Sequence, residues 1–174
     1  DSDLVALAQT GTGKTAAYGL PLLQKALSTK SSSKGEATCP SIIILSPTRE
    51  LCLQIADDME DFSKYLPEVR ILAVYGGTNI EPQIRALKHG VDIIVATPGR
   101  LMDLMKRGVA DLSEVQYIVL DEADEMLSMG FQEDLTFMLD AAPAERRTLL
   151  FSATLARDIV QLAKTYQRDA LRID

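Results

Sequence analysis

Short apolar runs alternate along the chain with longer segments in which apolar residues recur every three or four positions. The runs predict strands over Leu4–Ala8, Ser41–Ser46, Val69–Tyr75, Asp92–Ala96, Tyr117–Leu120, Thr148–Ser152 and Ala170–Ile173. Several are almost continuous in Val, Ile and Leu, which is typical of strands covered on both faces in a parallel sheet. The intervening segments have helical spacing, as in Leu51, Ile55 and Met59. The pattern predicts an α/β fold with a mainly parallel sheet of about seven strands and helices on both faces.

The composition fits a single folded domain without a membrane segment. The chain has 174 residues, of which 47% are hydrophobic and 25% charged, as in ordinary globular proteins. Cys39 and Cys52 are too few for a disulfide framework, so we expect reduced thiols in a cytoplasmic protein. Residues 28–40 are rich in Ser, Lys and Gly and predict an exposed loop after the first helix. Asp1 lies almost inside the first predicted strand, so we expect the natural N-terminus to lie further upstream.

A glycine-rich segment follows the first predicted strand. The sequence AQTGTGKT at Ala8–Thr15 fits the P-loop pattern with Ala in place of the first Gly. Glycines allow the backbone to approach phosphate oxygens, and the start of the next helix adds partial positive charge. Lys14 is predicted to bind the β- and γ-phosphates, and the Thr15 hydroxyl to ligate Mg²⁺. The strand before and the helix after the segment disfavour the alternative, a chance Gly/Thr turn. The predicted nucleotide-binding residues are Ala8, Gln9, Thr10, Gly11, Thr12, Gly13, Lys14 and Thr15.

A P-loop needs an acidic partner for the metal, and the segment YIVLDEAD supplies one. The strand Tyr117–Leu120 would deliver Asp121 and Glu122 to the carboxyl edge of the sheet, where ligands of α/β proteins bind. We expect Asp121 to hold Mg²⁺ and Glu122 to orient and polarise the attacking water. The alternative is that either carboxylate merely caps the following helix.

Four further segments follow other predicted strands: PTREL at Pro47–Leu51, GG at Gly76–Gly77, TPGR at Thr97–Arg100 and SAT at Ser152–Thr154. With AQTGTGKT and DEAD at Asp121–Asp124, in this order and spacing, the chain resembles the N-terminal RecA-like domain of DEAD-box RNA helicases. The resemblance covers essentially residues 1–174. It implies a RecA-like P-loop NTPase fold that uses ATP and Mg²⁺.

The resemblance also assigns roles to individual residues. Lys14, Asp121 and Glu122 match catalytic positions. Asp124 matches the hydrogen-bonding partner of Ser152 and Thr154 on either side of Ala153, a link that couples hydrolysis to RNA handling. In the family fold, the strand that bears Ser-Ala-Thr lies between the P-loop strand and the DEAD strand. Positions that line the RNA backbone match Pro47, Thr48, Arg49, Gly76, Gly77, Thr97, Pro98, Gly99 and Arg100.

The formal net charge of -7 disfavours general polyanion binding, because phosphate contacts need cations. The RNA-lining loops resolve this conflict, since their backbone N–H and hydroxyl groups can meet phosphates while only Arg49 and Arg100 bring charge. Such contacts carry no base information, so RNA binding without sequence preference is expected. The alternative for both arginines is a surface ion pair with Glu50, Asp103 or a neighbour.

The family pattern has two parts that this sequence does not contain. These are an upstream adenine-reading segment and a second RecA-like domain whose arginines reach the γ-phosphate. We therefore expect the isolated chain to be monomeric and nearly inactive, and the full-length protein to be an RNA-stimulated ATPase that unwinds short duplexes or remodels RNA–protein complexes. Three alternatives remain: an ATP-dependent RNA clamp or scaffold with little unwinding, a DNA-directed helicase or translocase, and a partner-docking module.

Overall fold

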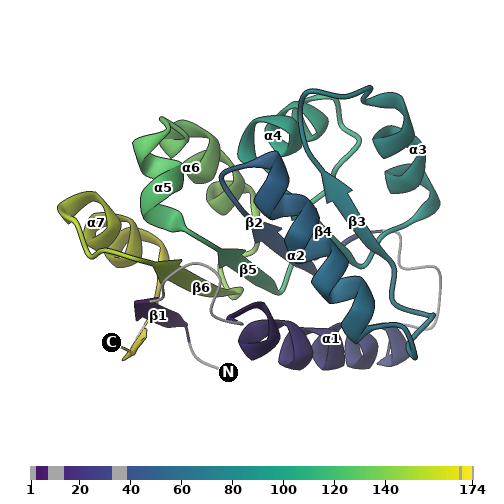
Figure 1. Cartoon of the computed structure of the whole chain (residues 1–174), viewed down its shortest axis with the longest axis horizontal. Helices are drawn as coiled ribbons and strands as arrows, with labels where there is room; N and C mark the ends of the chain where they lie inside the picture. The colour runs from purple at the N-terminus through teal and green to yellow at the C-terminus, as the bar shows by residue number, and fades with distance from the viewer. Residues whose placement is uncertain (1–2, 8–13, 33–38, 169, 174) are drawn as a thin grey trace.

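The computed structural model describes residues 3–7, 14–32, 39–168 and 170–173, and Figure 1 shows its strands and helices. The strands are β1 (Leu4–Leu7), β2 (Ile42–Leu45), β3 (Ile71–Val74), β4 (Ile93–Ala96), β5 (Tyr117–Leu120), β6 (Arg147–Ser152) and β7 (Leu171–Ile173). The helices are α1 (Lys14–Ser32), α2 (Arg49–Phe62), α3 (Glu81–His89), α4 (Pro98–Lys106), α5 (Ala123–Ser128), α6 (Gln132–Ala141) and α7 (Arg157–Tyr166). Every predicted strand is confirmed, with ends that differ from the prediction by no more than two residues; Ala8 lies outside the described residues.

The strands form one 7-stranded sheet in the order β3-β4-β2-β5-β6-β1-β7. All of its neighbouring strands pair in parallel. The strand β6 lies between β1 and β5, as the family resemblance implied. The first strand of the chain therefore pairs with the last two, and both chain ends lie at that side of the molecule in Figure 1.

Alternate residues of the central strands enter two separate cores. Ile43 and Leu45 pack in the core covered by α3, α4, α5, α6 and α7. Ile42 and Ile44 pack in the core beneath α1 and α2. All four side chains are buried, which explains why β2 reads as continuous Ile and Leu instead of an alternating pattern. The prediction of helices on both faces is confirmed.

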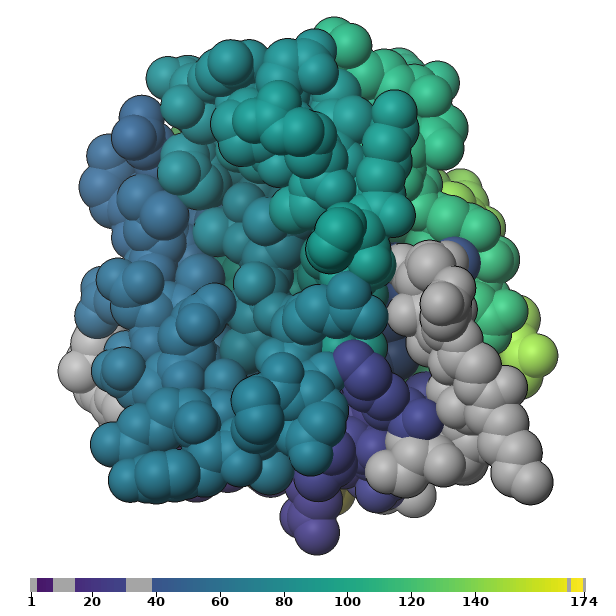
Figure 2. Space-filling view, turned by 90° about the vertical axis from the view of Figure 1, so that its right-hand side faces the viewer, coloured from purple at the N-terminus to yellow at the C-terminus, as the bar shows by residue number. Residues whose placement is uncertain are grey.

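The two outer strands are less covered than the central ones. At one edge, β3 keeps three half-buried residues and contacts both α2 and α3. Residues of this part of the chain, coloured blue to teal, dominate the face seen in Figure 2. At the other edge, all residues of β7 are exposed. None of the described helices combines the length and apolar character needed to cross a bilayer.

The loop predicted over residues 28–40 begins later than expected, because α1 continues to Ser32. Contacts with distant parts of the chain hold these last helical turns. The Lys30 ammonium pairs with Asp92 at 3.2 Å, and the Thr29 hydroxyl contacts the Gln116 side chain at 3.1 Å. The composition of this segment favours a loop, but these tertiary contacts outweigh that local preference.

Replacing Asp3 with Ala should destabilise the attachment of β1 to the sheet. The Asp3 side chain is 2% exposed, and its carboxylate accepts hydrogen bonds from the backbone N–H groups of Thr148 and Arg168. Each buried N–H that loses its acceptor costs about 1–3 kcal/mol, so the free energy of unfolding should fall by about 2–4 kcal/mol. Urea unfolding would measure the loss. Asp57→Ala, an exposed control on α2, should change stability by less than about 0.5 kcal/mol; equal stability losses for the two variants would contradict the prediction.

The two cysteines should differ sharply in reactivity. Burial raises the pKa of Cys52 to about 12, so this thiol stays protonated at pH 8, whereas Cys39 is only half-buried. Because the thiolate is the nucleophile, iodoacetamide at pH 8 should modify Cys39 in the native protein and Cys52 only after unfolding. Peptide mass spectrometry would locate the label. In the native Cys39→Ser variant, residues 1–174 should carry no label. Native labelling of Cys52 at the rate of Cys39 would refute this assignment.

Candidate nucleotide and RNA site

The predicted motif segments meet at the carboxyl edge of the sheet and divide it into two halves. The strands β5, β6 and β1 are neighbours and lead into the DEAD, SAT and P-loop segments. The strands β3, β4 and β2 are also neighbours and lead into the GG, TPGR and PTREL segments. Loops that leave one edge of a parallel sheet form the usual ligand crevice of α/β proteins. The DEAD and SAT segments and the predicted RNA residues thus occupy adjoining halves of one edge.

The P-loop itself is described only at its end. Ala8, Gln9, Thr10, Gly11, Thr12 and Gly13 lie outside the described residues, and so does the side chain of Lys14. The backbone of Lys14 begins α1, and Thr15 follows in the first turn. This placement agrees with a P-loop that runs directly into a helix N-terminus.

Asp121 is fully buried at the end of β5, with 0% of its surface exposed. Its backbone N–H donates to the carbonyl of Leu45 at 2.8 Å, which fixes the chain at the junction with β2. Its side-chain Oδ2 accepts a hydrogen bond from the Tyr18 hydroxyl at 2.9 Å. A buried carboxylate needs such donors because it has lost its water. The structure therefore holds the Asp121 carboxylate in a defined position beside the start of α1.

Tyr18 is a site residue that the sequence analysis missed. Its side chain is 3% exposed, and its hydroxyl has hydrogen-bond partners in both Asp121 and Thr15. Burial, followed by the neighbouring Asp121 charge, raises the pKa of Tyr18 far above its usual range, so the phenol remains a proton donor. The sequence signal that could have identified Tyr18 is helical spacing, because a residue three positions after Thr15 lies on the same helix face.

Glu122 has an unusual backbone conformation at the turn between β5 and α5. Its φ of 53° and ψ of 52° lie in the left-handed region, which is uncommon for residues other than glycine and costs roughly 1–2 kcal/mol. Its side chain makes no hydrogen bond that caps α5, so the capping alternative is not supported for Glu122. Backbone strain of this kind is typical of functional sites.

Asp124 and Thr154 connect the DEAD and SAT segments as predicted. The Thr154 hydroxyl donates to Asp124 Oδ2 at 3.2 Å, while Asp124 Oδ1 accepts from the backbone N–H of Glu125 at 3.0 Å. Ser152 behaves differently from the prediction, because its hydroxyl donates to the carbonyl of Thr154 at 2.7 Å. Ser152 thereby shapes the turn that presents Thr154 and Ala153 instead of contacting Asp124. The Thr154–Asp124 hydrogen bond thus joins the DEAD and SAT segments in addition to the backbone pairing of β5 with β6.

On the other half of the edge, Arg49 is exposed and lies over an aromatic ring. Its guanidinium carbon is 5.1 Å from the centre of the Tyr75 ring, while Asp103 pairs with Arg107 at 3.0 Å. Among the residues that the structure describes, Arg49 forms no ion pair with Glu50 or Asp103, so this alternative is not supported for Arg49. The Thr48 side chain caps α2 by accepting from the Leu51 N–H at 3.1 Å, and its own O–H remains able to donate. Pro47, just before Thr48, is buried.

Arg100 holds the GG loop in place. Its guanidinium donates to the Thr78 carbonyl at 2.9 Å and to the Gln83 side chain at 3.1 Å, and Gln83 donates to the Tyr75 carbonyl at 3.2 Å. In this structure Arg100 therefore organises the loop next to Gly77, whose φ of 78° favours glycine. Gln83 and Tyr75 were not predicted as site residues.

The remaining predicted RNA residues lie on the same half of the edge. Thr97 precedes α4 and makes no side-chain hydrogen bond to its N-terminus, and Pro98 and Gly99 form the first positions of that helix. An added Cβ at Gly76 would meet nothing within 4 Å among the described residues. Small residues and helix N-terminal N–H groups leave room for a phosphate backbone to approach closely.

The oxygen donors near α1 fit magnesium. Asp121 and Thr15 share the Tyr18 hydroxyl as a partner, so a carboxylate and a hydroxyl oxygen lie close together. Among the described residues, no group of three His, Cys, Asp or Glu side chains is arranged to hold a metal. Mg²⁺ bound to nucleotides commonly uses one or two protein oxygens plus phosphates and waters. The donor set therefore suits an Mg²⁺–nucleotide complex.

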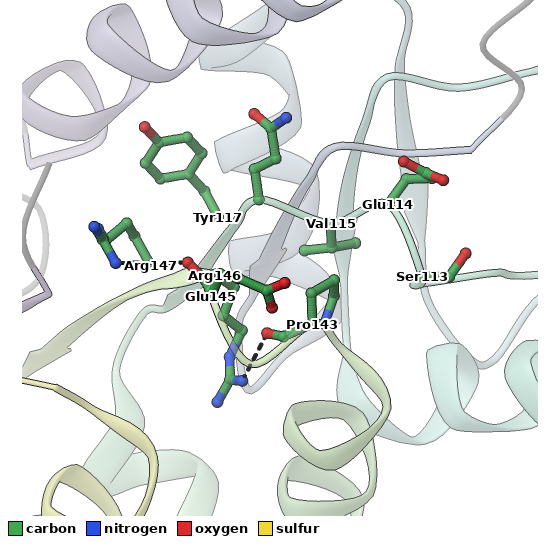
Figure 3. A pocket seen from close by; sticks show the side chains of 9 residues that line it. Ser113, Glu114, Val115, Tyr117, Pro143, Glu145, Arg146 and Arg147 are labelled. Carbon is green, nitrogen blue, oxygen red and sulfur yellow. Dashed lines mark hydrogen bonds between the residues drawn. The ribbon is translucent and has the colours of Figure 1, made fainter.

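Two pockets lie at the opposite, amino edge of the sheet. One, of 390 Å³, is lined by Tyr117 and Arg147, the first residues of β5 and β6. Figure 3 shows that Arg146 and Arg147 there are engaged by the backbone carbonyls of Pro143 and Glu145. The other, of 550 Å³, lies between the start of β3 and the end of α3. Neither pocket contains a residue of the predicted motifs, so the open carboxyl edge is the better candidate site.

Comparison with known proteins agrees with this arrangement. A family model described as DEAD/DEAH box helicase matches residues 1–162. The DEAD-box ATP-dependent RNA helicase 9 of Oryza sativa subsp. japonica is 46% identical over 172 residues, which cover 99% of this chain and 27% of that protein. The ATP-dependent RNA helicase DeaD of Escherichia coli (strain K12) is 46% identical over 167 residues, which cover 96% of this chain and 25% of that protein. The chain thus spans 25% to 27% of the length of these relatives.

Solved structures show the same fold. A DEAD box protein from the hyperthermophile Methanococcus jannaschii matches with a TM-score of 0.86 and 43% identity, over 99% of this chain and 45% of that chain. The yeast DEAD-box splicing factor Prp28 matches with a TM-score of 0.88 and 31% identity, over 98% of this chain and 40% of that chain. The predicted RecA-like architecture is therefore confirmed.

Proposed function

Because the chain belongs to the DEAD/DEAH box helicase family, we propose that residues 1–174 form the N-terminal RecA-like domain of an ATP-dependent RNA helicase. In the full-length protein, a second RecA-like domain would complete the ATP and RNA sites, and an upstream segment would read adenine. The proposal extends to a cytoplasmic location, in keeping with two cysteines, Cys39 and Cys52, which are too few for a disulfide framework. Residues 1–174 alone would be a monomer with very low ATPase activity, because the second RecA-like domain would supply the arginines that stabilise the transferred phosphoryl group.

In the ATP-binding half of the sheet edge, a small number of side chains and the P-loop backbone would bind and hydrolyse ATP. The P-loop backbone and Lys14 would bind the phosphates, with Thr15 and Asp121 holding Mg²⁺. When bound, Mg²⁺ neutralises negative charge on the β- and γ-phosphates. Glu122, held by its left-handed backbone, would orient the attacking water and accept its proton. Positioning and electrostatics supply most of the catalysis in such phosphoryl transfers.

The RNA half of the edge would bind the sugar–phosphate backbone without reading bases. Arg49, which lies over the Tyr75 ring, would supply an exposed positive charge, whereas Arg100 would act mainly by holding the GG loop through Thr78. Backbone N–H groups at the start of α4 would supply further donors. The Asp124–Thr154 hydrogen bond would couple RNA binding to ATP hydrolysis.

The observation that carries the proposal is the meeting of five motif segments and the start of α1 at one sheet edge, with DEAD and SAT already bonded at 3.2 Å. The test is steady-state ATPase activity of the full-length protein with RNA, with DNA and without nucleic acid. We expect strong stimulation by RNA of unrelated sequences and little by DNA. Equal stimulation by DNA would instead support a DNA-directed helicase or translocase.

Strand separation would distinguish the two RNA-directed forms of the proposal. A helicase should release one strand of a short RNA duplex in the presence of ATP. A long-lived complex with single-stranded RNA that separates no duplex would identify an ATP-dependent clamp or scaffold.

A further inference from the structure

The buried phenol of Tyr18 lies between the two residues expected to hold magnesium. Its hydroxyl donates to Asp121 Oδ2 at 2.9 Å, and the Thr15 side chain is a second partner of the same hydroxyl. We propose that Tyr18 is a positioning residue for the magnesium site. Its hydroxyl fixes the orientation of the Asp121 carboxylate and the distance of this carboxylate from the Thr15 hydroxyl. This inference rests on the proposed ATP-binding function and adds a residue outside the predicted motifs.

Tyr18 is rigid enough for this role. Its ring packs against Phe151 of β6 with centroids 5.3 Å apart and an interplanar angle of 39°. The next residue, Gly19, brings α1 close to α2, since an added Cβ would come within 2.8 Å of the Met59 sulfur. The close helix contact sets the rotation of α1, and the ring contact sets the side chain. The hydroxyl is consequently fixed relative to both β5 and β6.

The chemistry of Asp121 makes this hydrogen bond consequential. Its carboxylate has no exposed surface, so protein groups in place of bulk water decide how it is oriented. With Oδ2 bonded to Tyr18, the plane of the carboxylate is set before any cation arrives. Partners that orient metal-ligating carboxylates typically contribute about 10- to 100-fold to metal affinity or activity. A phenylalanine at position 18 would fill nearly the same volume and provide no donor.

Tyr18 also lies next to the coupling segment. Phe151, its ring partner, precedes Ser152, whose hydroxyl bonds the Thr154 carbonyl at 2.7 Å. The phenol therefore connects the start of α1 and the end of β5 directly, and the end of β6 through packing. A change in the position of α1 would therefore move the hydroxyl that bonds Asp121 and the ring that packs on Phe151.

The decisive variant is Tyr18→Phe in the full-length protein. Binding of a fluorescent ADP analogue would be titrated with Mg²⁺, and Mn²⁺ binding to the ADP complex would be followed by electron paramagnetic resonance. We expect the Mg²⁺ and Mn²⁺ concentrations for half-saturation to rise about tenfold. The affinity for ADP in EDTA should stay at the wild-type value, because no phosphate contact is lost. That second measurement also verifies that the variant is folded.

A matched control exists at the other end of the molecule. The Tyr166 hydroxyl also bonds a carboxylate, that of Asp140, and Tyr166→Phe should leave the Mg²⁺ dependence unchanged. Tyr18→Leu, which removes the ring as well, should lose at least as much Mg²⁺ affinity as Tyr18→Phe. Wild-type Mg²⁺ dependence in Tyr18→Phe, whatever Tyr18→Leu shows, or the same shift in Tyr166→Phe, would overturn the assignment. Failure of the wild-type protein to bind ADP at all would overturn the proposed function instead.

Discussion

Replacing Glu122 with Gln in the full-length protein should slow ATP hydrolysis by about 100- to 10,000-fold, the usual contribution of a general base, while ATP remains bound. The amide keeps the size of the side chain but cannot accept the proton of the attacking water. Asp121 is unchanged in this variant, and its bond to Tyr18 at 2.9 Å should persist, so metal and nucleotide binding should survive. Single-turnover hydrolysis and ATP-analogue affinity would be measured on the same samples.

Glu125→Gln is a suitable control for this prediction. Glu125 lies on the same short helix, α5, and its side chain is exposed, so the same chemical change should leave turnover near the wild-type rate. Normal hydrolysis by Glu122→Gln would mean that another group activates the water. A large loss of ATP affinity would mean that Glu122 serves the metal, as Asp121 is expected to do.

Replacing Lys14 with Ala should weaken the binding of ATP as well as slow its hydrolysis. A charge-assisted hydrogen bond contributes about 1.5–3 kcal/mol, so the dissociation constant for ATP should rise about 10- to 100-fold. The affinity for adenosine, which has no phosphate, should not change. Equilibrium binding of both ligands to the full-length protein would test this difference.

Lys25→Ala on the same helix provides the comparison. It removes an equal charge from α1 at an exposed position more than two helical turns from Lys14, and it should leave ATP affinity within about twofold, the range expected of a screened surface charge. Wild-type ATP affinity in Lys14→Ala would place the phosphates elsewhere than at the start of α1.

The strands could be predicted from sequence because burial on both faces makes them almost continuously apolar. The runs at Ile42–Leu45 and Ile93–Ala96 are fully buried in the structure, and no polar face competes with that pattern. The end of α1 could not be predicted, since it depends on Lys30 meeting Asp92, 62 residues away. Local composition contains no information about such a partner.

The residues of the candidate site likewise fall into those that could be identified from sequence and those that could not. The motif residues could be identified from sequence because their types and order are specific, and the Asp124–Thr154 contact followed from the family resemblance. Tyr18, Tyr75 and Gln83 could not be identified, because each looks like an ordinary packing or surface residue until the fold sets its distances. The Tyr18–Asp121 bond joins residues 103 positions apart, and only the order of the strands makes it possible.

The position of β1 in the sheet also affects how the protein is made. A ribosome produces β1 well before its partner strands β6 and β7, which lie at residues 147–152 and 171–173. Until that distal portion has emerged, the apolar LVAL segment of β1 lacks both of its described partner strands and is open to chaperones or to aggregation. Contacts this remote in sequence are also slow to form. During biosynthesis, the half of the sheet that carries the PTREL, GG and TPGR loops can thus assemble early, and the ATP-binding half closes last.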